Sequence, residues 1–147
     1  MKTVKEIIDS KGKDIWSVTP DTTVFEALKL MAEKEIGAVI VIKDSKVVGV
    51  MSERDYARKV VLHGKSSVQL TVGEIMSDKV LFIDISRSVE DCMALMINKR
   101  IRHLPVFDEN NLVGFISIGD VVKAIIDEKE FFIDQLVHYI KDTPAIQ

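Results

Sequence analysis

The feature that most constrains this 147-residue chain is that it repeats itself. Shifted by 65 positions, residues 16–60 align with residues 81–125 without a gap. A unit of about 45 residues has too little interior to be stable alone, so we expect the two copies to share a core. The identical residues are Val24, Leu30, Met31, Lys34, Ile36, Val41, Val48, Gly49, Ser52 and Asp55, recurring as Val89, Leu95, Met96, Lys99, Ile101, Val106, Val113, Gly114, Ser117 and Asp120.

Each copy contains the same local patterns in the same order. A hydroxyl residue followed three positions later by an acid predicts a helix N-terminus at Thr23 and at Ser88, and apolar residues follow at helical spacing. Two short apolar runs joined by a polar turn then predict a pair of strands. These runs are residues 38–42 and 47–51 in the first copy, and 104–107 and 112–116 in the second. A second helix should open at Ser52 and at Ser117.

The expected fold is α/β (α+β), with two units of about β-α-β-β-α packed as a pseudo-two-fold pair. A short extended piece precedes each copy, and the matching segments TVKEII and TVGEIM precede those pieces. We expect the domains to follow chain order, as residues 1–65, 66–128 and 129–147. The last of these begins within EKEFFIDQLVHYIK, an amphipathic helix with Phe131 and Phe132 available either to cover the pair or to join two chains.

Composition and charge limit the classes of function. A net charge of −3 disfavours a general electrostatic grip on nucleic acid or on an anionic membrane, so any anion must be held by a local site. No apolar run approaches the roughly 20 residues that span a bilayer, and the N-terminus lacks the apolar centre of a secretory signal. A single cysteine, Cys92, excludes an internal disulfide framework. The chain is therefore expected to be cytoplasmic.

The paired pattern of DTTVFEALKLM with IGAVIVIKDSKVVGVMSERD, and of SRSVEDCMALM with IRHLPVFDENNLVGFISIGD, resembles a tandem cystathionine-beta-synthase (CBS) domain pair, or Bateman module. The resemblance covers nearly the whole chain. Among such modules, the chain is similar to the small stand-alone bacterial type. The resemblance implies a regulatory ligand-sensing role. The ligand would be AMP, ADP, ATP, S-adenosylmethionine or NAD, held without catalysis in clefts between the units. It also implies a homodimer and an unknown effector protein.

The resemblance places the main cleft at Ser17, Arg102, His103, Ser117 and Asp120. Taken alone, Ser117 and Asp120 fit an ordinary helix cap. In similar modules the aspartate accepts the ribose hydroxyls while the hydroxyl residue serves ribose or phosphate. Arg102 is either a solvated charge near a helix end or a phosphate donor, and His103 would add a hydrogen bond or a positive charge.

A second, weaker cleft would use Ser52, Arg54, Asp55 and Phe82. Phe82 stands where the first copy has Ser17, and Gly37 and Ala38 replace the basic pair, so this cleft lacks charge unless Arg54 or Arg58 compensates.

Catalysis and metal binding have little support in the sequence. The three histidines are scattered, and no Walker loop, GxGxxG, HExxH or CxxC motif is present. Two alternatives to a sensor stay open, a structural protein with vestigial clefts and a cryptic nucleotide hydrolase.

Overall fold

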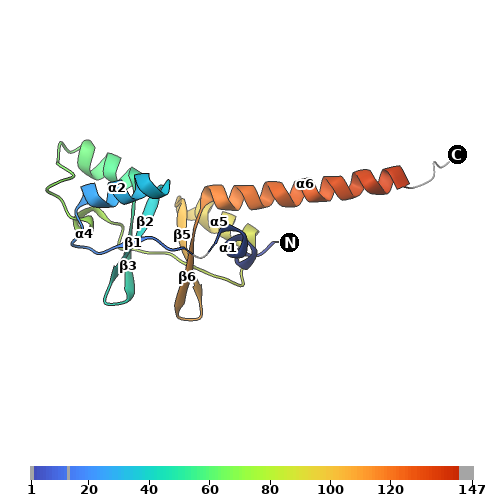
Figure 1. Ribbon diagram of the computed structural model, residues 1–147, viewed down its shortest axis with the longest axis horizontal. Coiled ribbons are helices and arrows are strands. Elements are labelled where there is room, and N and C mark those ends of the chain that lie inside the picture. The colour runs from blue at the N-terminus through green and yellow to red at the C-terminus, as the bar shows by residue number, and fades with distance from the viewer. Residues whose placement is uncertain (1, 13, 143–147) are drawn as a thin grey trace. The chain divides into compact units, whose positions relative to one another are not determined.

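The computed structural model describes residues 2–12 and 14–142, which form two compact units (Figure 1). The first-repeat unit comprises residues 14–82. The second-repeat unit joins residues 2–12 to residues 83–142. Each is a small three-stranded sheet with helices, which confirms the α/β class expected from the repeat.

Corresponding elements follow the same order in both units. The first-repeat unit contains β1 (Ser17–Val18), α2 (Val24–Lys34), β2 (Ala38–Lys43), β3 (Lys46–Ser52), α3 (Glu53–Tyr56), a π-helical turn η1 (Ala57–Val61) and α4 (Val72–Ile75). The second-repeat unit contains α1 (Val4–Lys11), β4 (Ile83–Asp84), α5 (Val89–Lys99), β5 (His103–Asp108), β6 (Asn111–Ser117) and α6 (Ile118–Asp142). The predicted order of extended piece, helix, strand, strand and helix is confirmed in each.

The two sheets have the same topology, and both contain a register shift at the same place. In each, the short first strand runs parallel to the middle strand, which pairs antiparallel with the last. The register slips by one residue after Val41 in one sheet and after Val106 in the other, positions that correspond in the repeat. The duplication therefore preserves the backbone pairing as well as the apolar pattern.

Local signals explain where α2 and α5 begin and end. The side chain of Thr23 accepts a hydrogen bond from the Glu26 N–H at 3.1 Å, and that of Ser88 accepts one from the Asp91 N–H at 3.0 Å. These bonds satisfy N–H groups that the first turn of a helix leaves without an intrahelical partner. Both helices stop where the next residue adopts a left-handed conformation, with φ of 54° and 55°.

The compact units do not follow chain order at the N-terminus. Helix α1 inserts Val4, Ile7 and Ile8 into the core of the second-repeat unit, so it leaves the predicted domain 1–65. Its start is fixed by the backbone, because the Val4 N–H donates to the Arg87 carbonyl at 2.9 Å. Helix α4 plays the corresponding part in the first-repeat unit, where Val72 and Ile75 are buried, although these residues fall within the predicted domain 66–128.

Two glycines explain how closely these helices approach the sheets. A side chain at Gly114 would collide with Ile8, and a Cβ at Gly49 would lie 2.5 Å from the sulfur of Met76, at the end of α4. Each glycine is thus required where an apolar side chain crosses the middle of the last strand.

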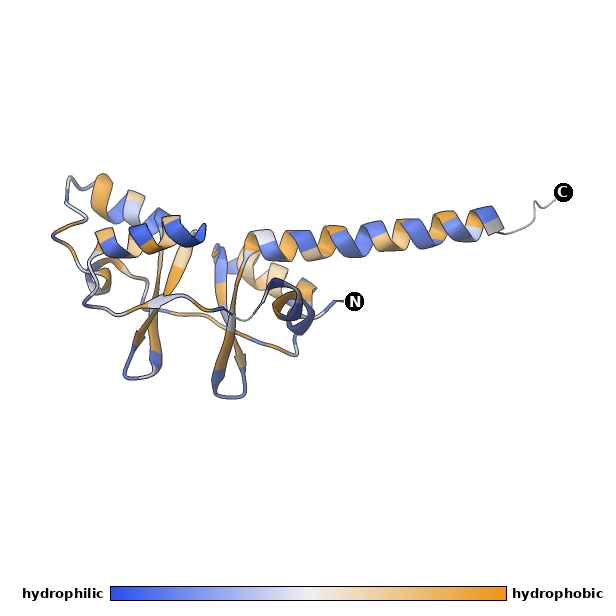
Figure 2. Ribbon diagram, in the orientation of Figure 1, coloured by the Kyte–Doolittle hydropathy of each residue, from blue (hydrophilic) through white to orange (hydrophobic). Residues whose placement is uncertain are grey.

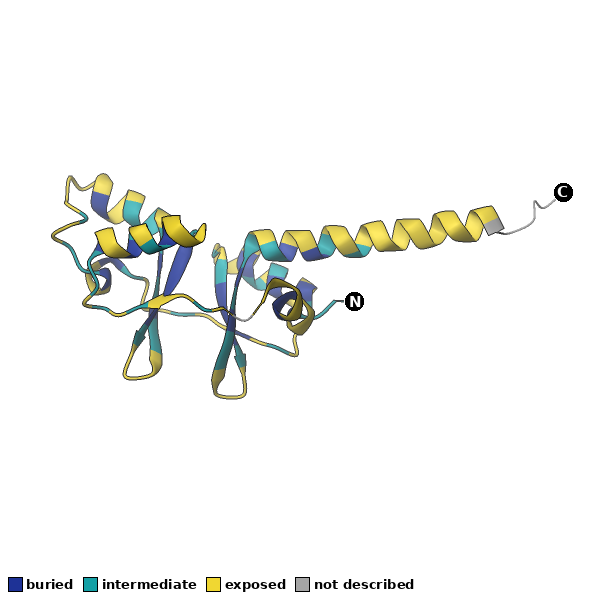
Figure 3. Cartoon of the chain, viewed as in Figure 1, coloured by how far each residue is buried: buried dark blue, intermediate teal, exposed yellow. Residues whose placement is uncertain are grey.

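Helix α6 is one continuous helix, whereas the sequence led us to expect a separate helix after the second repeat. In the first repeat the corresponding helical segment ends at Val61, and the turn that follows contains Gly64, which has a φ of +66°. Lys129 occupies the matching position, 65 residues later, and lysine favours helix. The helix consequently continues beyond the end of the repeat, and its later turns are exposed (Figure 3).

Candidate functional site

The antiparallel pairing of β5 and β6 brings the predicted polar residues of the second repeat together. His103 lies directly opposite Ser117 in the ladder. The N–H of Ile118, the first residue of α6, donates to the Arg102 carbonyl at 2.8 Å. Arg102, His103, Ser117 and Asp120 therefore gather around the beginning of α6 in one unit.

Ser117 and Asp120 form the reciprocal helix cap that their spacing allows. The Ser117 N–H donates to Oδ2 of Asp120 at 2.8 Å, and the Asp120 N–H donates to Oγ of Ser117 at 3.2 Å. Capping fixes the carboxylate at the N-terminus of a 25-residue helix, where the backbone favours negative charge. The hydrogen bond from the Ser117 N–H and the bond from the Lys11 ammonium both end on Oδ2 of this carboxylate.

Sequence reasoning missed one residue of this cluster, Lys11. Its ammonium lies 2.7 Å from Oδ2 of Asp120 and donates to the Phe115 carbonyl, also at 2.7 Å. Lys11 is the last residue of α1, so it reaches the site only because α1 packs on the second-repeat unit. Its spacing from Ile8 puts both on one face of α1, but the sequence alone does not reveal which unit that face contacts.

The electrostatics of the cluster keep Asp120 ionised. Burial alone would raise the pKa of this carboxyl group. The bonds from Lys11 and Ser117 outweigh that cost, and the pKa is lowered below its ordinary value of 3.8. The site thus presents a carboxylate whose charge is already neutralised by a lysine.

His103 is uncharged at neutral pH. Burial lowers its pKa to about 4. The positive charge of Lys11 acts in the same direction, Asp120 opposes it, and Arg102 lowers the pKa by a smaller amount. The ring stacks on Phe115 with centroids 5.6 Å apart. Of the two roles expected for His103, a hydrogen bond remains and a positive charge does not.

A groove of about 330 Å³ runs beside the cluster, between α1 and α6. It opens onto Asp120 and carries lysines and acids in equal number, so its wall has no excess of one charge. The groove is lined by Lys2, Glu6, Ile7, Ser10, Lys11, Asp120, Lys123, Ala124 and Asp127.

The first-repeat unit carries a related but simpler arrangement. Ser52 and Asp55 form a complete capping box, and Lys59 lies 3.1 Å from Oδ1 of Asp55 while donating to the Ile75 carbonyl at 2.8 Å. Residue 38, opposite Ser52 in the ladder, is an alanine where the second repeat has His103. Arg54, the additional cation expected here, follows Ser52 by two residues and is half-buried.

Ser17 and Phe82 stay predictions as site residues. Ser17 is exposed in β1, where it pairs with Ile40, and it belongs to the first-repeat unit rather than to the unit that holds Asp120. Phe82 is 62% exposed and is the last residue of the first-repeat unit.

The described chain has neither a clustered metal site nor a membrane-spanning helix. Residues 2–12 and 14–142 contain no group of three or more His, Cys, Asp or Glu side chains placed to hold a metal ion. Within the same ranges, no helix is both long and apolar enough to cross a bilayer. The cytoplasmic location expected from the sequence stays a prediction.

Comparison with known proteins decides the family. The family model for the CBS domain matches twice, over residues 4–62 and 72–127. The chain belongs to the CBS domain family. Its two repeats form a tandem CBS pair, a regulatory and signal-transduction module, as the resemblance in the sequence implied.

Relatives of this CBS pair span bacteria, archaea and plants. The mitochondrial CBS domain-containing protein CBSX3 of Arabidopsis thaliana is 36% identical over 95% of this chain and 72% of its own. A solved protein from Burkholderia ambifaria MC40-6, described as a signal-transduction protein with CBS domains, is 48% identical, with a TM-score of 0.83 over 86% of this chain and 95% of its own. The CBS pair of protein MJ0100, solved with 5'-methylthioadenosine and S-adenosyl-L-methionine, shares the fold at 22% identity and a TM-score of 0.76.

Proposed function

We propose that this CBS pair binds an adenine nucleotide at the Asp120 cluster and passes the occupied state to a partner protein without catalysis. The observation that carries the proposal is the convergence of a capped carboxylate, a neutral histidine and two cations at the start of α6. A carboxylate suits the two hydroxyls of a ribose, and cations suit a phosphate. The candidate ligands are AMP, ADP, ATP and NAD, and the MJ0100 pair accommodates adenosyl ligands on the same fold.

The residues of the cluster take different roles in this proposal. Asp120 accepts the ribose hydroxyls, Ser117 supports the ribose or the phosphate, and Arg102 contacts the phosphate. His103 donates or accepts one hydrogen bond as a neutral ring.

Because Lys11 is already paired with Asp120, a ligand must displace this lysine to bind the carboxylate. Its ammonium shares Oδ2 of Asp120 with the Ser117 N–H, so a ribose that takes this oxygen must compete with the lysine. A ligand that brings its own phosphate offers the displaced ammonium a new anion, whereas a bare nucleoside does not. The site should therefore prefer nucleotides over nucleosides.

We assign the cleft at Asp55 a weaker role. Its carboxylate is capped by Ser52 and paired with Lys59, but Ala38 provides no hydrogen-bonding side chain where the other unit has His103. Arg54 and Phe82 would contact the distal part of a larger ligand such as NAD.

Asp120→Asn tests the site, with Asp55→Asn as the matched control. The amide oxygen of asparagine can still accept the Ser117 N–H, so folding should be preserved while the charged acceptor is lost. A hydrogen bond to a charged group contributes about 1.5–3 kcal/mol, so AMP affinity measured by calorimetry should fall by about ten- to a hundredfold for Asp120→Asn and less for Asp55→Asn. Wild-type affinity in a folded Asp120→Asn would remove this residue from the site. An equal or larger loss in Asp55→Asn would reverse the ranking of the clefts.

The reciprocal caps themselves favour one alternative, a structural protein with vestigial clefts. Both aspartates already have a structural task in capping a helix, and both are already paired with a lysine. If AMP, ADP, ATP and NAD all failed to raise the melting temperature of the wild-type protein, this alternative would replace the sensor.

We also propose that the module acts as a homodimer that signals to an effector protein. Dimerisation is testable by sedimentation velocity of the wild-type protein at micromolar concentration. Absence of nucleotide turnover over hours would agree with a sensor. Hydrolysis abolished by Asp120→Asn would instead indicate an enzyme.

A further inference from the structure

The second half of α6 lacks cover from the described chain. Every residue from 129 to 141 is exposed, although α6 stays helical through this segment (Figures 1 and 3). An isolated helix of fewer than about 12–15 residues is marginal in water. A segment of this length is expected to remain helical when a packed face supports it.

This segment carries an apolar face of the kind that packs against another helix. Ile126, Ile133 and Ile140 recur every seven residues, and Val122, Lys129 and Leu136 fall between them at heptad spacing. We call these six residues the α6 stripe. Ile133 is 56% exposed and Ile140 71%. Figure 2 shows apolar and polar colours alternating along α6.

The charge of the segment argues against a membrane or nucleic acid as the occupant. Between residues 127 and 141 there are four acidic side chains and two lysines. An interfacial helix on an anionic lipid surface is typically rich in lysine and arginine on its polar face, and a phosphate backbone selects the same residues. A protein surface with its own apolar stripe is the better fit.

A second copy of α6 complements the stripe when it lies antiparallel. A parallel pair would place Lys129 against Lys129 of the second copy inside an apolar seam, which costs stability. In an antiparallel pair centred between Ile133 and Leu136, Lys129 meets Ile140 instead. The same arrangement brings Glu130 near Lys141 of the second copy, twice by symmetry. Charge complementarity thus selects both the occupant and its direction.

The pairing also sets the length of the interface. In the antiparallel pair the stripe residues from Lys129 to Ile140 face one another, over about 16 Å along the axis at 1.5 Å per residue. Side chains beside the stripe enlarge the surface, including Phe132, 63% exposed, and Val137, 41% exposed. Pairing over this length would supply part of the roughly 800 Å² per partner that a standard interface buries.

We propose that α6 is the dimerisation element of this protein and that it pairs antiparallel with α6 of a second copy through the α6 stripe. The inference rests on the homodimer of the proposed function and names its surface. Nucleotide binding at Asp120 does not depend on it.

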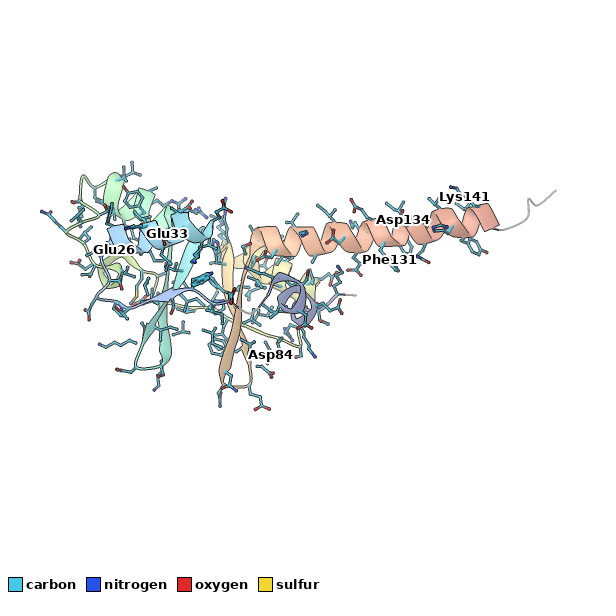
Figure 4. The ribbon with its side chains drawn as sticks, viewed as in Figure 1. Glu26, Glu33, Asp84, Phe131, Asp134 and Lys141 are labelled. Atoms are coloured by element: carbon cyan, nitrogen blue, oxygen red, sulfur yellow. The ribbon has the colours of Figure 1, made fainter. Side chains whose placement is uncertain are left out.

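The test compares Leu136→Glu with Phe131→Glu in the full chain. Leu136 lies in the stripe, whereas Phe131, 65% exposed, follows Lys129 by two residues and so falls on the opposite side of a helix with 3.6 residues per turn. Its side chain points outward from α6 (Figure 4). In sedimentation velocity we expect wild type and Phe131→Glu to dimerise alike, and Leu136→Glu to weaken the dimer at least about 100-fold, because a charge would be buried in the seam. A dimer untouched by Leu136→Glu would mean that another surface joins the copies. A monomeric wild type, or equal loss in both variants, would overturn the proposal.

Cysteine cross-linking tests the direction of the pair. Because Cys92 is buried, it should not compete for an oxidant. Mixed Lys129→Cys and Ile140→Cys proteins should form a disulfide between unlike copies, while Ile140→Cys alone should not cross-link. Efficient cross-linking of Ile140→Cys with itself would show a parallel pair and refute the antiparallel arrangement. AMP calorimetry on Leu136→Glu separates this question from nucleotide binding, which should persist.

Discussion

His103 should make the protein lose stability in mild acid. Its pKa in the folded chain is about 4, against 6.5 for an unburied histidine, because burial disfavours the imidazolium. Between these values the unfolded chain binds a proton that the folded chain does not, so stability rises with pH and falls as pH decreases from about 6.5 toward 4. Above pH 7 the ring is neutral in both states and contributes nothing to this dependence.

The size of the effect follows from the two pKa values. At pH 5.0 the unfolded histidine is almost fully protonated and the folded one is almost fully neutral, which lowers the free energy of unfolding by about 2 kcal/mol relative to pH 7.5. Urea unfolding of wild type and His103→Gln at both pH values measures it. The difference between the two pH values should be smaller by about 2 kcal/mol in His103→Gln, because glutamine does not titrate.

His138, which is exposed, provides the control. His138→Gln should keep the pH dependence of the wild type. If His103→Gln kept it as well, the imidazole would be charged or solvated in the folded protein, and its assignment as a neutral site residue would be wrong.

Three further predictions concern other parts of the molecule. Lys11→Met should bind adenosine more tightly, because the variant loses the competitor for the ribose site. It also loses a phosphate partner, so the preference for AMP over adenosine measured by calorimetry should fall by roughly tenfold. An unchanged preference would remove the lysine from the site. Gly114→Ala should lower the free energy of unfolding in urea by about 1–3 kcal/mol because the new methyl group collides with Ile8. Gly119→Ala, which meets only an ordinary contact at the start of a helix, should not, and equal costs would contradict this account of the close packing. Cys92 is buried, and burial raises its pKa to about 11. A thiol reagent at pH 8 should therefore modify it only as fast as the protein opens. Rapid reaction in the native state would show that Cys92 on α5 is accessible to solvent.

The sequence predicts the elements of each repeat well because their signals are local. The hydroxyl of Thr23 caps α2, the alternating and continuous apolar runs become β2 and β3, and Ser52 opens α3, all as the spacing indicates. Four of the five residues predicted for the main cleft lie together, because strand pairing and the first turn of α6 fix them within one unit; their role as a site stays a prediction.

The sequence does not show which of the two sheets a short apolar helix packs against. The segments TVKEII and TVGEIM are equally able to cover either sheet, and packing assigns α1 to the second-repeat unit. Lys11 was missed for that reason. The continuity of α6 was missed for a different reason. The end of the second repeat suggests the end of a helix, but the chain has no glycine there to stop it.

The placement of α1 has a consequence for how the chain is made. Its apolar face is completed by Val121 and Ala124, more than 100 positions later, so it leaves the ribosome long before its own binding surface exists. At a synthesis rate of about 5–20 residues per second, Val4, Ile7 and Ile8 would wait roughly 6–25 seconds in an unfinished chain. During that interval the sheet of the first repeat can already form. A chaperone could bind α1 in this time, or α1 could pack against the sheet of the first repeat instead of its own.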